Sequence, residues 1–253
     1  MTDTTFVNRV TPITAEWLND INDAVYGSPI PGSWINTAYG RTALEITNSV
    51  VPSNYAYFPG DIRRYGAVIN GVTNDTTAWA SALASGHPVW HPGGISVASV
   101  SIRKDNAAFY GPGENIAIIK APSGALSVGG VVEVGDTTSG NSATAYDKFT
   151  WKGIGVDGNK ASTTAPTDDL KGHGITLTKI TNWFIQTRVV NCYNAGVGVF
   201  INSNYGHLNV IIESCGNVTY TQPGFDINSS KYITGTVITK DCYVGSRVLD
   251  NCW

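Results

Sequence analysis

The last eighty residues repeat, and this repeat limits what the chain can fold into more than any other feature. Successive units begin at Gly174, Gly196, Gly224 and Gly245, so their starts are 22, 28 and 21 residues apart. Each complete unit continues with alternating apolar residues, which are Ile175/Leu177, Val197/Val199 and Phe225/Ile227. Periods in the twenties with one such unit per repeat are typical of solenoids, whose coils pack on their neighbours. The sequence therefore predicts stacked coils of short strands.

Each complete unit also places a cysteine 18 or 19 residues after its glycine, at Cys192, Cys215 and Cys242. Stacked coils lie about 4.8 Å apart, so equivalent residues form ladders along the axis. We expect a ladder of buried, reduced thiols, because parallel coils give poor disulfide geometry. Together with Cys252, the spacing fits neither a CxxC zinc pair nor a redox motif. An extra loop at residues 217–223 explains the 28-residue spacing, and the regular leucine frame of leucine-rich repeats is missing.

The composition favours an all-β body and excludes several classes of protein. Charged residues are 14% of the chain and glycine contributes 28 of 253 residues, which is unlike a helical bundle. A net charge of −3 argues against a duplex nucleic-acid partner and suits weakly charged partners such as sugars. No apolar run approaches the roughly 18 residues of a membrane span, and the first residues do not resemble an export signal. We expect no membrane insertion, no cofactor and no metal.

Residues 1–60 differ from the rest of the chain. Residues 14–27 predict one short amphipathic helix, and its apolar stripe comprises Trp17, Leu18, Ile21 and Val25. A helix of about twelve residues is marginal alone, so the stripe must pack on something. Two interpretations stay open, namely docking onto a larger assembly, and packing on this chain's own body or on copies of itself. Residues 28–60 are rich in Pro, Gly, Ser and Asn, which is typical of a connector ordered by its contacts.

Residues 63–83, RRYGAVINGVTNDTTAWASAL, resemble the entry segment of pectate-lyase-like right-handed parallel β-helix proteins. The resemblance implies that this fold extends over roughly residues 63–253. In the same stretch Asp75 is expected to cap a short helix by accepting a hydrogen bond from the amide of Ala78. The apolar face of this helix, Ala78, Trp79, Ala82 and Leu83, is expected to plug the open end of the stack. His91, in VWHPGG, is expected to be an ordinary side chain at a coil corner.

The start of the chain, TFVNRVTPITAEWLNDINDAVYG, resembles the virion-attachment segment of tail fibres and tailspikes of short-tailed bacteriophages. The resemblance implies a homotrimer located in the virion after synthesis in the host cytoplasm. Residues 1–60 would bind tail or adaptor proteins, with the helix stripe as docking face, and residues 61–253 would present the β-helix to host surface polysaccharide. The sequence stops nine residues into its last coil, at Trp253. We therefore expect either a longer natural polypeptide, or that the trimer or a partner covers this end.

Hydrolysis of a polysaccharide needs two carboxylates, about 5 to 9.5 Å apart, on either side of the scissile bond. The candidates are Asp157, Asp168, Asp169 and Asp226. Asp157 stands in GVDGN, which is also the sequence of an ordinary turn. The polar loop at residues 159–174, which includes His173, either overhangs a groove or is simply solvated. Asp226 alternates with Phe225 and Ile227, so it is expected to face outward. No pair stands out, and no ladder of aspartates suggests calcium.

Aromatic side chains stack on the faces of sugars, and the candidates here are Trp151, Trp183, Tyr205, Tyr220 and Tyr232. Alternation alone does not say which of them are exposed. Two classes of function therefore stay open. In the first, the chain is a structural adhesin that links the virion to a receptor. In the second, it is a polysaccharide depolymerase, a hydrolase or a lyase, whose site lies in the β-helix, between subunits or beyond residue 253.

Overall fold

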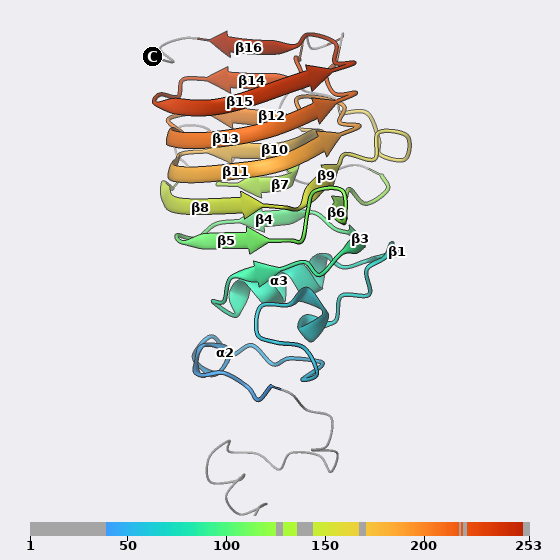
Figure 1. Ribbon diagram of the computed structural model, residues 1–253, viewed down its shortest axis with the longest axis vertical. Coiled ribbons are helices and arrows are strands. Elements are labelled where there is room, and N and C mark those ends of the chain that lie inside the picture. The colour runs from blue at the N-terminus through green and yellow to red at the C-terminus, as the bar shows by residue number, and fades with distance from the viewer. Residues whose placement is uncertain are drawn as a thin grey trace, which may run out of the picture.

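Parallel strands stacked coil upon coil make up most of the protein, as the computed structural model shows (Figure 1). The structure describes residues 39–124, 129–135, 144–166, 171–217, 219 and 222–249. The predicted docking face and three candidate site residues lie outside these ranges, namely Trp17, Leu18, Ile21, Val25, Asp168, Asp169 and Tyr220. Within the described ranges, the mainly β body expected from composition and repeats is confirmed.

Two parallel sheets run along the stack. The strands of the first sheet are β1 (Asn70–Asn74), β2 (Val89–Trp90), β3 (Gly94–Val97), β5 (Ala107–Tyr110), β6 (Ala117–Lys120), β8 (Tyr146–Lys152), β9 (Gly155–Asp157), β11 (Ile180–Val190), β13 (Asn204–Glu213) and β15 (Ile233–Lys240). Their order is β1-β3-β6-β9-β11-β8-β5-β2, and β13 adds beside β11 and β15 beside β13. The long strands β11, β13 and β15 therefore cover the C-terminal half of this face.

The second sheet has six strands. They are β4 (Val100–Ile102), β7 (Gly130–Val134), β10 (His173–Thr178), β12 (Val197–Phe200), β14 (Phe225–Asn228) and β16 (Ser246–Leu249), in the order β16-β14-β12-β10-β7-β4. Ile175 is paired with Val197, Val197 with Phe225, and Phe225 with Ser246. Those pairs are separated by 22, 28 and 21 residues, the spacings of the sequence repeat. Each repeat unit of the sequence is therefore confirmed as one coil of the stack.

Residues with left-handed backbone bend the chain at both ends of the long strands. Near their starts stand Asn182, Tyr205 and Tyr232, with φ of 54°, 55° and 57°. Just after their ends stand Asn191, Ser214 and Asp241, with φ of 55°, 54° and 52°. Asparagine tolerates this conformation better than other side chains, which explains its use at both corners. Each corner thus forms its own ladder along the stack.

The N-terminal end of the stack is closed by α3 (Thr76–Ala84), which lies against the first coils in Figure 1. Its buried residues are Ala78, Trp79 and Ala82, and Leu83 is partly buried against the core, so the predicted apolar face is confirmed. The ring of Trp79 stacks on Phe109 and on Trp151, with centroids 6.1 Å away in both cases. The core of the stack therefore begins with aromatic rings and continues with aliphatic residues and cysteines.

Asp75 is the N-cap residue of α3, as predicted, but the predicted hydrogen bond to its side chain is wrong. Its side chain makes no capping hydrogen bond to α3. Instead, the Asp75 carboxylate accepts hydrogen bonds from the amides of Val68 (2.8 Å) and Ile69 (3.1 Å) and from the hydroxyl of Ser96 (2.8 Å). These contacts hold Ile69 at a φ of 54°, a conformation that β-branched residues rarely adopt. Asp75 therefore stabilises the turn before β1.

The described part of the connector is tied to the stack by one buried ion pair. It contains α2 (Ala43–Thr47) and leads into the 3-10 helix η2 (Ile62–Tyr65). Arg64 Nε donates to Glu45 Oε1 at 2.7 Å, and both side chains are fully buried. The guanidinium also donates to the carbonyls of Tyr39, Gly40 and Tyr57 at 2.7–3.2 Å. Residues 39–60 are thus ordered by contacts with η2.

Candidate functional site

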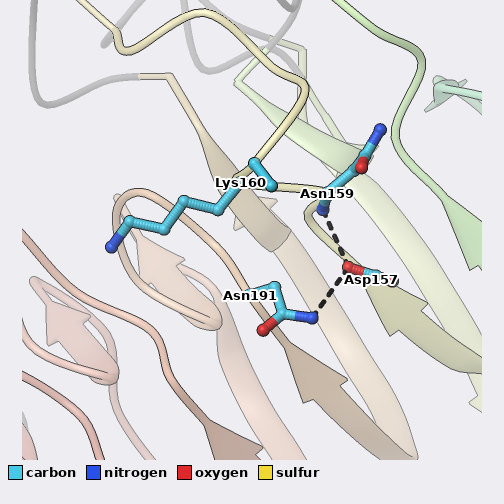
Figure 2. A pocket seen from close by; sticks show the side chains of 5 residues that line it. Asp157, Asn159, Lys160 and Asn191 are labelled. Atoms are coloured by element: carbon cyan, nitrogen blue, oxygen red, sulfur yellow. Dashed lines mark hydrogen bonds between the residues drawn. The ribbon is translucent and has the colours of Figure 1, made fainter.

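A polar pocket of about 410 Å³ opens at the corner that follows β9 and β11 (Figure 2). It is lined by Asp157, Asn159, Lys160, Ala161 and Asn191. Asp157 ends β9, and Asn191 directly follows β11 on the next coil, because Asp157 is paired with Val190. Residues 34 positions apart in the sequence therefore meet at this corner.

The local sequence explains how the pocket is held. Asp157 Oδ1 accepts a hydrogen bond from the Asn159 amide at 2.8 Å, which closes the turn expected for GVDGN. Asn159 has a φ of 51°, and its side chain donates to the carbonyl of Ala121 at 2.9 Å. Gly158 is required because a Cβ there would lie 2.5 Å from the carbonyl oxygen of Asn191. The turn therefore lies directly against the neighbouring coil.

Asn191 is hydrogen-bonded to Asp157 in the pocket, whereas Lys160 points away from both. Asn191 Nδ2 donates to Asp157 Oδ1 at 3.3 Å, and Figure 2 shows both bonds to this carboxylate. The Lys160 side chain extends away from Asp157 in Figure 2, and its ammonium donates to the carbonyl of Gly216 at 3.4 Å. The same ammonium lies 5.3 Å from the centre of the Tyr193 ring. The lining of the pocket thus offers a carboxylate, amide groups and an ammonium, which suit hydrogen bonding to hydroxyl groups.

The described residues bring no pair of carboxylates together at this pocket. Asp157 is its one acidic lining residue among them. Asp226, expected to face outward as a candidate, is instead 1% exposed on β14, so the prediction that it is accessible is wrong. Alternation sets the side of the strand correctly only with respect to the core, and other segments cover the outer side. His173, the loop histidine, is also buried, at the start of β10.

The tryptophans proposed as sugar-stacking residues are buried, so that prediction is wrong for both. Trp151 is 0% and Trp183 2% exposed. Trp151 donates its indole proton to the carbonyl of Ile154 at 2.8 Å. Trp183 lies against Gly206 of the next coil, where a Cβ would come within 2.0 Å of its ring. A tryptophan fits inside this narrow core only because a glycine faces it.

Two of the tyrosine candidates, in contrast, lie on the surface. Tyr205 and Tyr232 are 57% and 58% exposed, and their rings stack with centroids 4.9 Å apart and an angle of 8° between planes.

The sequence analysis does not predict the pocket residues Asn159, Lys160 and Asn191. The available signal for Asn191 was its position immediately before the first cysteine of the ladder, where a coil corner is expected.

The described residues were also compared with the requirements of a metal site and of a membrane span. No group of three or more His, Cys, Asp and Glu side chains lies together there in a way that would hold a metal ion. No described helix is long and apolar enough to cross a membrane.

Comparison with known sequences identifies bacteriophage appendages as relatives. The chain is 26% identical over 209 residues to the pre-neck appendage protein of Bacillus phage B103, which covers 77% of this chain and 24% of that protein. It is 25% identical over 213 residues to the pre-neck appendage protein of Bacillus phage phi29, with the same coverage. The chain spans about a quarter of the length of these relatives. The similarity confirms the predicted location in the phage virion. No protein-family model matches, so the pectate-lyase-like assignment stays a prediction.

Comparison with solved structures supports the same relationship at the level of the fold. The N-terminal fragment of gene product 12 of bacteriophage phi29 superposes with a TM-score of 0.56 and 20% identity, over 72% of this chain and 32% of that one. The pre-mature form of gene product 12 gives a TM-score of 0.58 and 18% identity, over 74% and 30%. ORF18 of Geobacillus virus E2 gives 0.50 and 17%, over 81% and 41%. These likenesses show a shared architecture.

Proposed function

We propose that this chain is a subunit of a phage tail appendage that attaches to the virion through residues 1–60 and recognises host surface polysaccharide through residues 61–253. The observation that carries the proposal is the similarity to pre-neck appendage proteins, which extends over 77% of the chain. In this proposal the coil stack is a right-handed parallel β-helix and the assembly is a homotrimer. The right-handed β-helix comes from the resemblance to pectate-lyase-like proteins and the homotrimer from the resemblance to tailspikes, and both remain part of the proposal.

The pocket at Asp157 and Asn191 supports the polysaccharide part of the proposal. Its walls combine a carboxylate, amide groups and an ammonium, with Tyr193 beside the lysine. Such a mixture of hydrogen-bonding groups with an aromatic face matches the hydroxyls and the apolar ring faces of sugars. A single carboxylate lines the pocket, which favours binding over hydrolysis as the role of these residues.

The pocket is tested with two substitutions that leave the backbone undisturbed. Asn191→Gly removes the amide but keeps a residue suited to the φ of 55°, and Lys160→Ala removes the ammonium. Asn106→Gly is the matched control, because Asn106 is an exposed asparagine with a φ of 56° that does not line the pocket. Binding is measured by affinity electrophoresis in cell-wall polysaccharide purified from a strain on which the phage forms plaques.

We expect the double variant to lose at least about tenfold in affinity, since two hydrogen-bonding groups at about 1 kcal/mol each are removed. The control should bind like the unmodified protein. Equal binding by all three proteins would remove the pocket from the proposal. Release of reducing ends from the polysaccharide, abolished by Asp157→Asn, would instead identify the chain as a depolymerase.

Virion attachment is tested on the N-terminal stripe. Replacing Trp17 and Ile21 by alanine removes apolar burial of several kcal/mol, at about 25 cal/mol per Å², if this face docks on the tail. Virions assembled with the double variant should lack the appendage, while the purified protein keeps its β-sheet circular dichroism. Virions with a full complement of the variant would show that the helix packs on its own chain or on copies of it. A matched control is Leu44→Ala, an exposed apolar residue outside residues 14–27.

The homotrimer is tested by light scattering on the longest natural product at micromolar concentration. A marginal helix and a connector ordered by contacts gain stability from partner surface, so a mass of three chains is expected. A monomer would exclude this part of the proposal and leave the attachment and binding parts to their own tests.

A further inference from the structure

Tyr205 and Tyr232 form an exposed pair of rings whose presence the backbone does not explain. Both residues have left-handed backbone, with φ of 55° and 57°. Tyrosine is disfavoured in that conformation, whereas asparagine and glycine adopt it readily. Asn182 shows the favoured choice, since it occupies the equivalent corner one coil earlier with a φ of 54°. Residues held in unfavourable conformations are frequent at sites that clamp ligands.

Packing in the core does not explain the pair either. Each ring is more than half exposed, although the two lie parallel with centroids 4.9 Å apart. At Asn182 the side-chain amide donates to Asp147 at 2.7 Å, so the corner is stabilised by a hydrogen bond in that coil. In the next two coils, flat aromatic surface faces the solvent in the same position. These two corners carry exposed rings where Asn182 carries a stabilising amide. This difference indicates that the rings contact something outside the chain.

The outer face next to the tyrosines continues this surface. Phe184 on β11 and His207 on β13 stack with centroids 5.7 Å apart and an angle of 9°. Nδ1 of His207 lies 2.9 Å from the hydroxyl of Thr234, and its Nε2 lies 3.3 Å from the Asn209 amide nitrogen. Flat rings therefore alternate with hydroxyl and amide groups over three adjacent strands. His207, Asn209 and Thr234 are exposed.

We infer that Tyr205 and Tyr232, with the Phe184–His207 pair beside them, form a second carbohydrate-binding surface that takes uncharged sugar residues by stacking. The inference rests on the proposed function and deepens it by naming the residues and the contact type. Sugars present an apolar ring face edged by hydroxyls, which fits rings flanked by Thr234 and Asn209.

This surface and the Asp157 pocket lie at opposite ends of the long strands. Tyr205 stands near the start of β13, and Glu213 at its end is paired with Val190, the neighbour of the pocket residue Asn191. Eight residues separate Tyr205 from Glu213, a span of about 27 Å at the rise of a strand. One extended glycan that lies along the strands would therefore reach both sites and would cross Asn209, Thr236 and the exposed Ile211 and Ile238 between them.

The test exploits the left-handed backbone. Tyr205→Asn with Tyr232→Asn removes the rings but provides side chains that suit the conformation, so the melting temperature should stay the same or rise. Affinity for cell-wall polysaccharide from the host strain should fall about tenfold or more, because two stacking contacts are lost. Tyr205→Phe with Tyr232→Phe keeps the rings and should keep most of the affinity. Tyr110→Asn is the control, since this tyrosine is 37% exposed on β5 and belongs to neither site.

The inference is overturned if the asparagine variant binds polysaccharide as well as the unmodified protein. When the pocket variant Asn191→Gly with Lys160→Ala loses affinity in the same experiment, the proposed function stands and only the tyrosine surface is rejected. A lower melting temperature together with a smaller oligomer in the asparagine variant would show that the rings bind another copy of the chain. Absence of binding by the unmodified protein would reject both the proposed function and this inference.

Discussion

The two ends of the coil stack are stabilised in different ways. In the C-terminal coils, residues at fixed spacings stack on their equivalents, as in the ladder of Cys192 and Cys215, where the Cys192 amide lies 3.4 Å from Cys215 Sγ. At the N-terminal end, contacts are single and specific: Glu45 with Arg64, and Asp75 with two backbone amides. A repeat spreads its stability over many similar contacts. The closed end depends on a few buried polar groups, each of which costs free energy when its partner is missing.

Removal of Arg64 should produce the largest effect. Arg64→Met leaves Glu45 buried without its cation, and breaking such a pair costs about 3–5 kcal/mol. Hydrogen exchange in residues 39–65 should accelerate accordingly, while β11 and β13 stay protected. The control Lys148→Met removes an ion pair with Asp147 in which the two side chains are 66% and 41% exposed, and it should cost less than about 1 kcal/mol. An equal loss of stability in Arg64→Met and in the control would contradict the contrast between the two ends.

Overpacking the periodic region tests how closely its coils fit. Gly206→Ala places a Cβ within 2.0 Å of the Trp183 ring, which should destabilise the protein by about 1–3 kcal/mol in urea unfolding. In the background of Trp183→Leu the same substitution should cost much less, because the facing ring is gone. If Gly206→Ala destabilises both backgrounds equally, the Trp183 ring is not the reason for the glycine. Exchange in residues 39–65 should change little in either variant.

Acid should loosen the N-terminal end first. Burial opposes ionisation of Glu45, but hydrogen bonds from Arg64, Thr42 and Tyr65 outweigh it and lower the pKa from 4.5 to about 2. The folded state therefore holds this proton less tightly than the unfolded state, and the stability from Glu45 is lost as the pH falls from about 4.5 to 2. Limited proteolysis across this range should cleave near residue 45 first. Glu45→Gln should remove this pH dependence.

His91 adds an earlier step to the same acid response. Burial lowers the pKa of His91 from 6.5 to about 4, while its ring packs against Trp79. Because the unfolded state binds the proton more readily, stability is lost as the pH falls from about 6.5 to 4 and not further below. Hydrogen exchange of β2 and α3 should therefore rise within that window. Unchanged exchange there would show that burial does not suppress protonation of this ring.

The cysteine ladder should affect reactivity more than stability. Cys192, Cys215 and Cys242 are free thiols, as expected from their parallel stacking. The hydrogen bond with Cys215 and burial raise the pKa of Cys192 well above its ordinary value, and Cys242 is less buried. Alkylation followed by peptide mass spectrometry should therefore label Cys242 first and Cys192 last. Simultaneous labelling would mean that the coils open together rather than from the C-terminal end.

The sequence alone determined the coil repeat, because coil stacking demands a fixed number of residues per turn. The spacings of Gly174, Gly196, Gly224 and Gly245 match the strand register to the residue. The apolar face of α3 and the reduced cysteines were equally predictable, since each depends on positions within one repeat or one helix. The similarity of the chain to phage appendage proteins was also predictable from local motifs.

Only the tertiary structure decided which side chains reach the solvent. Trp151 and Trp183 were indistinguishable from Tyr205 by alternation, because the side of a strand that becomes core depends on coils tens of residues away. Asp226 is covered on its outer side, and Asp157 meets Asn191 through a strand pairing across 34 residues. The Asp75 carboxylate binds amides that precede it in a turn, rather than the helix that follows. Sequence periodicity fixes neighbours along the axis, whereas exposure depends on which segments close over each face.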